Sequence, residues 1–315
     1  MRKLVAVALI LVGIGLAGMI YTFSWDELLS FGTKPVSQQK SVDAAGVSSL
    51  TVESGSMDIE VVRGSSDQIV ARMEGRVSSK YLNKAKLEAE QVGDQLVIKS
   101  SYNTGFTIGI NFSFLKLIVE LPERNWDEVM LKASSGNIGA SDMSSRTLVM
   151  LTSSGRLKGE NLSANEMEYE TTSGEIELLG VTGESMKLDV SSGNIKVKNY
   201  KAETVKFNAT SGEASFINGT GELDGKASSG NIKVEVKEIT HSIKLDVTSG
   251  NIVVEAEQPP KSAELKLKTS SGSQKVEWNE VQVEKEDDRS FAGTIGAGSA
   301  ISIDLKTSSG NIAVK

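Results

Sequence analysis

Histidine and cysteine, two residue types that often act as catalytic bases and nucleophiles, are nearly absent from this sequence. His241 is the only histidine, and there is no cysteine. A Ser-His-Asp triad would need His241 as its base, and no suitably placed Gly-x-Ser-x-Gly turn accompanies it. A histidine-based zinc site needs more than one such ligand. We therefore interpret His241 as a surface or structural residue and assign no catalytic residue.

Two groups of carboxylates could in principle bind a cation or cleave a glycan. The run Glu284–Arg289 (EKEDDR) lacks the EF-hand and the glycine-aspartate repeat patterns of calcium sites, so it is interpreted as a solvated loop. Glu175 and Glu177 alternate along one expected strand face. Glycosidases use paired carboxylates, which keeps glycan cleavage open as the enzymatic alternative. No metal site is predicted.

The glycine-rich stretch Gly293–Gly298 (GTIGAG) is the remaining candidate for a cofactor. It lacks the following helix and the lysine of a phosphate-binding loop, so no cofactor is predicted. The net charge of −7, from 34 basic and 41 acidic residues, comes without a basic, aromatic-rich stripe, which argues against a nucleic-acid partner. The absence of cysteine excludes disulfides and a lipid-modified cysteine.

The N-terminus carries the strongest local signal. Leu4–Phe23 is an uncharged run of 20 residues, long enough at about 1.5 Å per residue to cross a bilayer as one helix. Arg2 and Lys3 precede it, so the positive-inside bias predicts a cytoplasmic tail at residues 1–3 and an extracytoplasmic remainder. A cleaved signal peptide is the alternative. Residues 24–45 are interpreted as a polar spacer above the cell membrane.

A repeat with a period near 19 residues organises the rest of the chain. Its marker is a Ser-Gly or Thr-Ser-Gly step, most fully written SSGNIKV. A fixed period of this length is typical of stacked repeats. The marker glycines are Gly136, Gly155, Gly174, Gly193, Gly212, Gly230, Gly250, Gly272 and Gly310. The last interval, 38 residues, equals two periods and suggests one coil without a marker.

Apolar residues alternate with polar ones on both sides of each glycine, as in Met186, Leu188 and Val190 before Gly193. This period of two predicts a strand, a tight corner at the glycine, and a second strand, all with one face buried. One coil buries too little to stand alone, so coils must stack. Asparagines follow several corner glycines, and we expect their amides to stack, with the preceding Ser and Thr hydroxyls doing the same.

We therefore predict an all-β, single-stranded parallel β-solenoid (β-helix) of about 19-residue coils, behind one transmembrane helix. The solenoid is expected over 131–315, with an excursion hairpin at about 284–298. Residues 46–130 form a β-rich lead-in or cap. Within it, strands at Lys86–Gln91 and Gln95–Ser100 would form a hairpin, with a short helix over Tyr81–Gln91 as the alternative. Gly105–Phe114 is expected to be a further strand.

The chain ends directly after a regular repeat strand, at Lys315. Solenoid ends normally need a cap. Either the excursion folds over the open end, or that end meets a partner, which leaves the oligomeric state open.

The LTVESGSMDIEV opening, the VELPE step and the tandem SSGNI corners resemble the putative-adhesin β-repeat family, whose members include LiaG-like membrane proteins of Gram-positive bacteria. The resemblance covers 41–315. It implies a β-solenoid outside the membrane, a link to cell-envelope stress and no established enzymatic activity, and it brings no catalytic residues with it.

Two functions remain open. The first is a non-enzymatic adhesin or scaffold that contacts a cell-wall polymer or an envelope protein. Lys187, Lys196, Lys198 and Lys206 are expected on one flank, where they would suit contact with an anionic polymer; a solvated face explains them equally well. The alternative is a membrane-proximal sensor or regulator that acts through a membrane partner.

Overall fold

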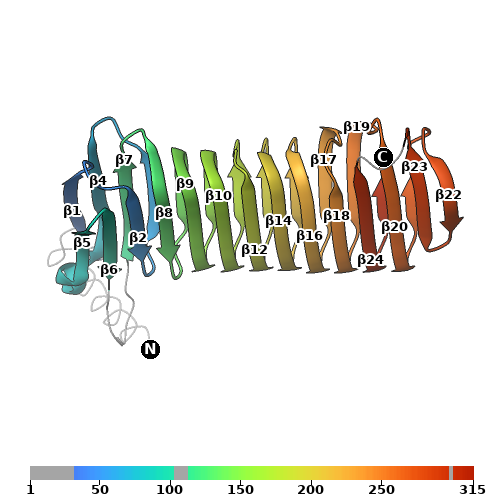
Figure 1. Ribbon diagram of the computed structural model, residues 1–315. Coiled ribbons are helices and arrows are strands. Elements are labelled where there is room, and N and C mark those ends of the chain that lie inside the picture. The colour runs from blue at the N-terminus through green and yellow to red at the C-terminus, as the bar shows by residue number, and fades with distance from the viewer. Residues whose placement is uncertain (1–31, 103–112, 298–300) are drawn as a thin grey trace, which may run out of the picture.

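The computed structural model describes residues 32–102, 113–297 and 301–315. These residues are almost entirely β-structure, arranged as one elongated stack of strands (Figure 1). The elements are β1 (Thr33–Asp43), β2 (Ser49–Ser54), β3 (Asp58–Arg63), β4 (Gln68–Ser78), the 3-10 helix η1 (Ser79–Lys84), β5 (Ala85–Val92), β6 (Gln95–Tyr102), β7 (Ser113–Leu121), β8 (Asn125–Ala133), β9 (Ile138–Ser154), β10 (Leu157–Ser173), β11 (Ile176–Leu179), β12 (Ser185–Ser192), β13 (Ile195–Lys198), β14 (Lys201–Ser211), β15 (Ala214–Ile217), β16 (Thr220–Ser229), β17 (Ile232–Glu238), β18 (Ile243–Ser249), β19 (Ile252–Gln258), β20 (Ala263–Ser271), β21 (Gln274–Val276), β22 (Gln282–Asp287), β23 (Ser290–Ile295), β24 (Ser302–Ser309) and β25 (Ile312–Val314).

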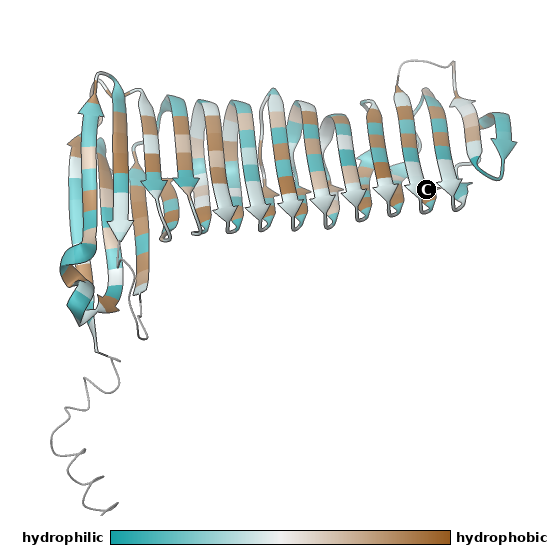
Figure 2. Cartoon of the chain, turned by 90° about the horizontal axis from the view of Figure 1, so that it is seen from below, coloured by the Kyte–Doolittle hydropathy of each residue, from teal (hydrophilic) through white to brown (hydrophobic). Residues whose placement is uncertain are grey.

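The predicted all-β stack of parallel strands is confirmed. Met186 of β12 pairs with Val205 of β14, and Ile176 of β11 pairs with Ile195 of β13, so in both cases the partner lies 19 residues further along the chain. Strands before the corners form one parallel ladder, and strands after the corners form a second. The alternating apolar residues of both ladders are buried between them, and Figure 2 shows the resulting stripes of hydrophobic and hydrophilic residues.

The corners need glycine because successive coils come too close for a side chain. Gly193 has φ 144°, and a Cβ there would overlap the carbonyl oxygen of Gly174 in the preceding coil. The asparagine after the corner also bonds to the next coil: Asn194 Oδ1 accepts from the backbone N–H of Glu213 at 2.9 Å. The expected ladder of amides therefore bonds mainly to the backbone, and one direct amide contact joins Asn251 to Asn231 at 3.1 Å.

Hydroxyl groups stabilise the corners from a different position than expected. Thr152 Oγ1 donates to the carbonyl oxygen of Gly136 at 3.1 Å, and Thr307 Oγ1 donates to that of Gly250 at 3.0 Å. These threonines stand three residues before their own corner glycine, on the buried face. The sequence predicts such bonds one or two residues before the glycine, but the side chains at those positions point to solvent.

A second corner, which the sequence analysis did not identify, turns the chain six residues after each of several marker glycines. Its residues have positive φ angles of 52° to 67° and follow one another at intervals of 19, at Asp142, Asn161, Gly180, Asn199 and Asn218. Asparagine, aspartate and glycine tolerate this conformation better than other residues. Asn161 Nδ2 donates to Asp142 Oδ1 at 3.0 Å, so these side chains also link neighbouring coils.

The order of the coils in space differs from their order in the sequence at the C-terminal end. The last coil, β24–β25, lies between β18–β19 and β20–β21 and pairs in parallel with both. No coil has lost its marker: the 38-residue interval contains the antiparallel hairpin β22–β23, whose strand β23 pairs with β20. The excursion thus covers the edge of β20, as the first alternative predicted.

The N-terminal end shows the same arrangement. The first coil, β2–β3, lies between β6–β7 and β8–β9. Strands β1, β4 and β5 then close this end with antiparallel pairs. Gln38 of β1 joins the two outer strands, because its side chain accepts from Leu87 N–H at 3.0 Å and donates to the Ala85 carbonyl at 2.9 Å.

The segment 24–45 is not simply a spacer, because Thr33–Asp43 forms strand β1; residues 24–31 lie outside the described residues. The hairpin β5–β6 is confirmed, whereas the alternative helix over Tyr81–Gln91 is wrong, since the helical turn ends at Lys84 and strand pairing follows. Most of the strand expected at Gly105–Phe114 lies outside the described residues.

Within the described residues, none of the helices has the length and apolar character needed to cross a membrane. The expected transmembrane segment Leu4–Phe23 lies outside them.

Candidate binding surface

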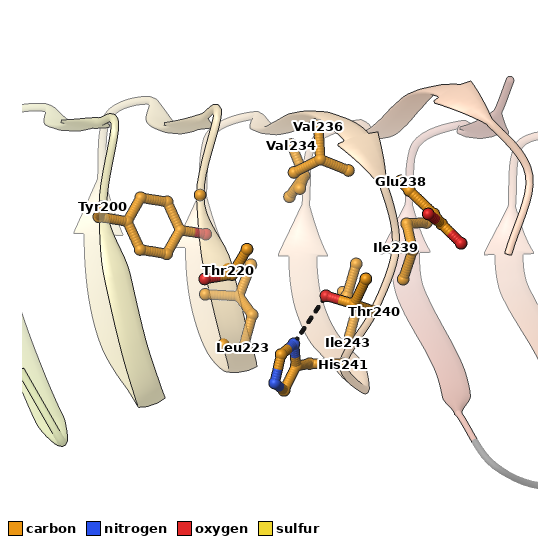
Figure 3. A pocket seen from close by; sticks show the side chains of 12 residues that line it. Tyr200, Thr220, Leu223, Val234, Val236, Glu238, Ile239, Thr240, His241 and Ile243 are labelled. Atoms are coloured by element: carbon orange, nitrogen blue, oxygen red, sulfur yellow. Dashed lines mark hydrogen bonds between the residues drawn. The ribbon is translucent and has the colours of Figure 1, made fainter. Parts of the chain in front are cut away.

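His241 lies at the rim of a small pocket between neighbouring coils (Figure 3). Its side chain is exposed, and Nδ1 lies 2.9 Å from the hydroxyl of Thr240. The pocket is lined partly by Tyr200 and Ile239, and its volume of about 20 Å³ leaves room for roughly one water molecule. The ring of Tyr200 is buried, and this burial raises the pKa of its hydroxyl. This arrangement offers no room for a substrate.

The acidic run at Glu284–Arg289 forms the hairpin turn rather than a cation site. Asp287 Oδ1 accepts from the backbone N–H groups of Arg289 at 2.9 Å and Ser290 at 2.8 Å, and Oδ2 accepts from the Ser290 hydroxyl at 2.7 Å. These bonds to the charged form, first that from the Ser290 hydroxyl, hold the pKa of Asp287 well below its usual range. In the part of the chain that the structure describes, no three His, Asp or Glu side chains form a group that could hold a metal ion.

The other two candidates are also part of the strand framework. Glu175 forms an ion pair with Arg156 at 3.1 Å, and Glu177 lies in register between Lys158 and Lys196. Gly293 lies within β23, paired with Leu265 of β20, so the GTIGAG stretch begins as a hairpin strand and not as a phosphate-binding loop.

The four lysines expected on one flank are divided between two faces. Lys187 and Lys206 are in register on β12 and β14, in the ladder before the corner. Lys196 and Lys198 lie on β13, in the ladder after the corner. The expectation was wrong because each glycine corner turns the chain onto the other face of the rod.

A hollow on the outer surface lies over β3, β9 and β10, and we call it the β9 groove. Its volume is about 320 Å³. Its floor is formed by Gly139 and Ser141, which occupy outward positions of β9 where the neighbouring strands carry Glu60 on one side and Lys158 and Glu160 on the other. The hollow exists because this one coil lacks long side chains at those positions.

Glycine at 139 is not required by the backbone. Its φ is not in the left-handed region, and a Cβ would meet nothing closer than the Ile59 carbonyl oxygen at 3.9 Å. The equivalent outward position is a lysine or glutamate in several coils, including Lys158, Glu177 and Lys196. A larger residue would therefore fit here, and its absence leaves the groove open.

The charges around the β9 groove pair with one another. Lys116 pairs with Glu60, Lys158 with Glu160 at 3.5 Å, and Arg156 with Glu175 at 3.1 Å. Asp58 lines the groove as well, and its Oδ1 accepts from the backbone N–H of Asn137 at 2.8 Å. The walls thus present hydrogen-bond donors and acceptors in fixed places with little excess charge of either sign.

The groove continues onto the row of glycine corners. Asn137 and Arg156 line both the β9 groove and a shallow hollow along the corners at Gly155, Gly174 and Gly193. An extended ligand lying in the groove could therefore follow the corners along the rod.

A family model described as Toastrack DUF4097 matches residues 47–315. The chain belongs to this family. The match begins just before β2 and runs to the C-terminal residue, so the Toastrack region contains every coil of the rod. It leaves out β1, which is part of the closing layer at the N-terminal end.

Solved structures resemble this Toastrack chain in fold at low sequence identity. A protein from Parabacteroides distasonis described as a putative adhesin is 11% identical, with a TM-score of 0.51, over 89% of this chain and 97% of that one. A protein from Bacteroides fragilis with the same description is 13% identical, with a TM-score of 0.46, over 90% and 97% of the two chains. The resemblance to a β-repeat adhesin family is confirmed. A search of curated proteins finds no match.

The β9 groove of this Toastrack chain contains none of the catalytic or metal-ligand patterns that a sequence reveals, so it was not predicted. A signal was nevertheless present. Gly139 and Ser141 interrupt the alternation of charged, outward-facing residues that follows most corners. A search for small residues at outward positions would have found the groove.

Proposed function

We propose that this protein is a non-enzymatic, membrane-anchored adhesin or scaffold of the cell envelope that binds a hydroxyl-rich polymer, such as a glycan, in the β9 groove. The observation that carries the proposal is the groove itself, open at Gly139 and continuous with the corner row. The description of a structural neighbour as a putative adhesin supports a binding role. The resemblance of the SSGNI corners to LiaG-like proteins supports a link to envelope stress.

The pairing of charges in the groove favours an uncharged polar ligand over an anionic one. Three basic residues (Lys116, Arg156 and Lys158) and three acidic ones (Asp58, Glu60 and Glu160) line the groove. A strongly anionic polymer would gain contacts with the bases only where it also approaches the acids, and like charges oppose this approach. Hydroxyl groups can donate to the carboxylates and accept from the amines without breaking the pairs.

Membrane anchoring is proposed from the sequence. The 20 uncharged residues Leu4–Phe23 follow Arg2 and Lys3, which favours a single membrane-spanning helix with its N-terminus inside and the rod outside the cytoplasm. Described residues begin at Gly32, so the eight residues 24–31 connect the end of this run to the rod.

Filling the groove tests the binding role. We expect Gly139→Gln to place a side chain on the groove floor without backbone strain and to weaken binding to purified envelope glycan at least tenfold in a pull-down titration. Ser215→Gln is the matched control, because Ser215 occupies the same position of its coil, three residues after the corner glycine Gly212. Equal binding by the wild type and both variants would refute the groove as the binding site.

A further inference from the structure

One end of the rod carries a concentration of positive charge that the overall composition hides. The start of β1, the end of β4, η1, the start of β5 and the start of β7 meet there, since Thr33 pairs with Ser78 and Val77 with Ser113. We call this region the basic tip and define it by five cations and one exposed aromatic residue: Lys34, Arg76, Lys80, Lys84, Lys86 and Phe114. All five cations are exposed, although the whole chain has a net charge of −7.

The cations of the basic tip are not neutralised by neighbouring carboxylates. Within the described residues none of them forms an ion pair; Arg76 instead donates to the hydroxyl and carbonyl oxygens of Thr33, at 3.0 Å and 3.1 Å. Elsewhere on the rod, lysines commonly pair with acids, as Lys187 does with Glu168 at 2.7 Å. The sequence of residues 24–31 contains two carboxylates, Asp26 and Glu27, which are fewer than the five cations of the tip.

The basic tip also presents apolar and aromatic surface. The side chain of Phe114 is 70% exposed, which is unusual for an aromatic residue in a strand. Phe114 lies in register with Arg76, one of the cations of the tip. Tyr81 is buried beneath Lys80, which lies 4.8 Å from the ring centre, and it packs edge-on against Tyr102 with ring centres 6.4 Å apart. An exposed aromatic residue next to basic residues is typical of surfaces that contact lipid headgroups.

The position of the basic tip agrees with such a contact. Strand β7 pairs with β3 only from Lys116 onward, so Ser113–Leu115 project past the row of glycine corners. Figure 2 shows this end, with η1, extending beyond the turns of the rod. Gly32, the first described residue, lies here, because its carbonyl oxygen accepts from Ser79 N–H at 2.9 Å. The chain from Phe23 to Gly32 reaches at most about 30 Å.

We propose that the basic tip binds the anionic headgroups of the bilayer that holds residues 4–23, and so fixes the orientation of the rod on the membrane. The inference rests on the membrane anchoring proposed above. Each basic residue close to an anionic surface strengthens binding about fivefold, so several acting together hold the tip against the headgroups. An anionic bilayer is favoured over a protein partner because the tip lies within reach of the membrane anchor.

The test uses the full chain reconstituted in vesicles, and the absence of native cysteine allows single labels. Asn83→Cys places a fluorophore on η1, and Glu203→Cys places one on the opposite edge of the rod, beyond the second corner at Asn199. Vesicles contain a headgroup-linked quencher and either 30% phosphatidylglycerol, on the order of an anionic leaflet, or phosphatidylcholine alone. We expect strong quenching at Asn83→Cys only in the anionic vesicles, and little quenching at Glu203→Cys in either.

Charge variants and salt complete the design. The double variant Lys80→Gln with Lys84→Gln should lower the ratio of docked to undocked tip about 25-fold. The double variant Lys237→Gln with Lys244→Gln is the control, because it changes the net charge equally but lies away from the tip, and it should leave this ratio unchanged. Salt at 1 M should weaken docking, since it shortens the screening length to about 3 Å.

Equal quenching in both lipids, or no effect of the tip variants, would overturn the proposal. Loss of the protein from carbonate-washed vesicles would instead refute the anchoring through residues 4–23.

Discussion

The backbone N–H of Gly250 donates to the carbonyl oxygen of Ser309 at 2.8 Å, although 59 residues separate them in the sequence. This bond is part of the ladder that places the final coil between two earlier ones. Among the described residues, β20 and β21 pair with the rest of the rod only through β24 and β25. The last coil therefore connects the closing layer at this end, residues 263–297, to the stack.

Removing that coil should release the closing layer. We expect a chain truncated after residue 301 to lose protection from proteolysis and hydrogen exchange over 263–297, while β12–β17 stay protected, because those strands keep their neighbours on both sides. Lys306→Gln, an exposed change within the same coil, should alter nothing. Unchanged protection of residues 263–297 after truncation would show that contacts other than strand pairing hold this layer.

Corner glycines should be far less tolerant than Gly139. Gly212 has φ 130°, and a Cβ there would overlap the carbonyl oxygen of Gly193, so Gly212→Ala should lower the free energy of unfolding by about 1–3 kcal/mol. Gly139→Ala should be neutral or stabilise by up to about 1 kcal/mol, since its conformation suits alanine. Urea denaturation followed by circular dichroism measures both. Similar losses for the two variants would contradict the steric account of the corners.

Phe207 and Gly225 should be energetically coupled. The two residues are in register on β14 and β16, and a Cβ on Gly225 would overlap the ring of Phe207. Phe207→Ala should cost about 3–5 kcal/mol through the cavity it leaves, and Gly225→Ala about 1–3 kcal/mol through overpacking. A double-mutant cycle uses the smaller change Phe207→Leu together with Gly225→Ala. We expect the double variant to lose less stability than the sum of the losses of these two single variants. Strict additivity in a double-mutant cycle would contradict this packing.

Acid should loosen the C-terminal coil before the rest of the rod. Lys315 Nζ lies 2.8 Å from Glu255 Oε1, and this bond lowers the pKa of Glu255 from its ordinary value of 4.5. A lowered pKa in the folded state gives a contribution that is complete well above pH 4.5 and is lost as the pH falls through the lowered value. Both side chains are in contact with solvent, which screens the ion pair, so the effect should be small.

Hydrogen exchange of β25 at pH 6 and pH 3.5, corrected for intrinsic rates, measures this loss. Glu255→Gln should abolish the pH difference, and Glu257→Gln, two residues further along, should preserve it. A pH difference that persists in Glu255→Gln would assign the effect to another group.

The membrane segment offers a test between the two functions left open by the sequence. Replacing residues 4–23 with an unrelated membrane-spanning helix should leave an adhesin or scaffold active, because its contacts lie in the rod. Cell-surface binding and envelope-stress phenotypes of the exchanged strain measure this. Loss of the phenotype despite normal levels and membrane insertion would favour the regulator that acts through a membrane partner.

The coil itself could be predicted from the sequence because each copy meets the same steric demand. Gly193 must lack a side chain, and Leu188 and Val197 must be apolar, for the same reasons as their counterparts 19 residues away. The order of the coils could not be predicted. The corners at Gly250 and Gly310 are flanked by nearly the same residues, and the corner at Gly272 differs only after the glycine, where Ser273 and Gln274 replace Asn and Ile, so the local pattern does not state which coils become neighbours.

Strand β1 was missed for a different reason. It is an outer antiparallel strand, and Val36 is its only fully buried side chain, so its sequence shows no alternation. The basic tip also escaped notice, because its cations come from segments as far apart as Lys34 and Lys86 and become neighbours only through the pairing of β1 with β4 and the turn at η1.

The first and last coils in the sequence each lie between two other coils and not at an end of the rod. This arrangement affects how such a protein can change length during evolution. A duplicated coil added at either terminus of the gene would find no free strand edge to pair with, because antiparallel strands already cover both ends of the rod. A unit gained or lost within residues 157–237, where sequence order and spatial order coincide, would leave both ends intact. Recombination inside the gene can therefore adjust the reach of the molecule in steps of one coil, about 4.8 Å each.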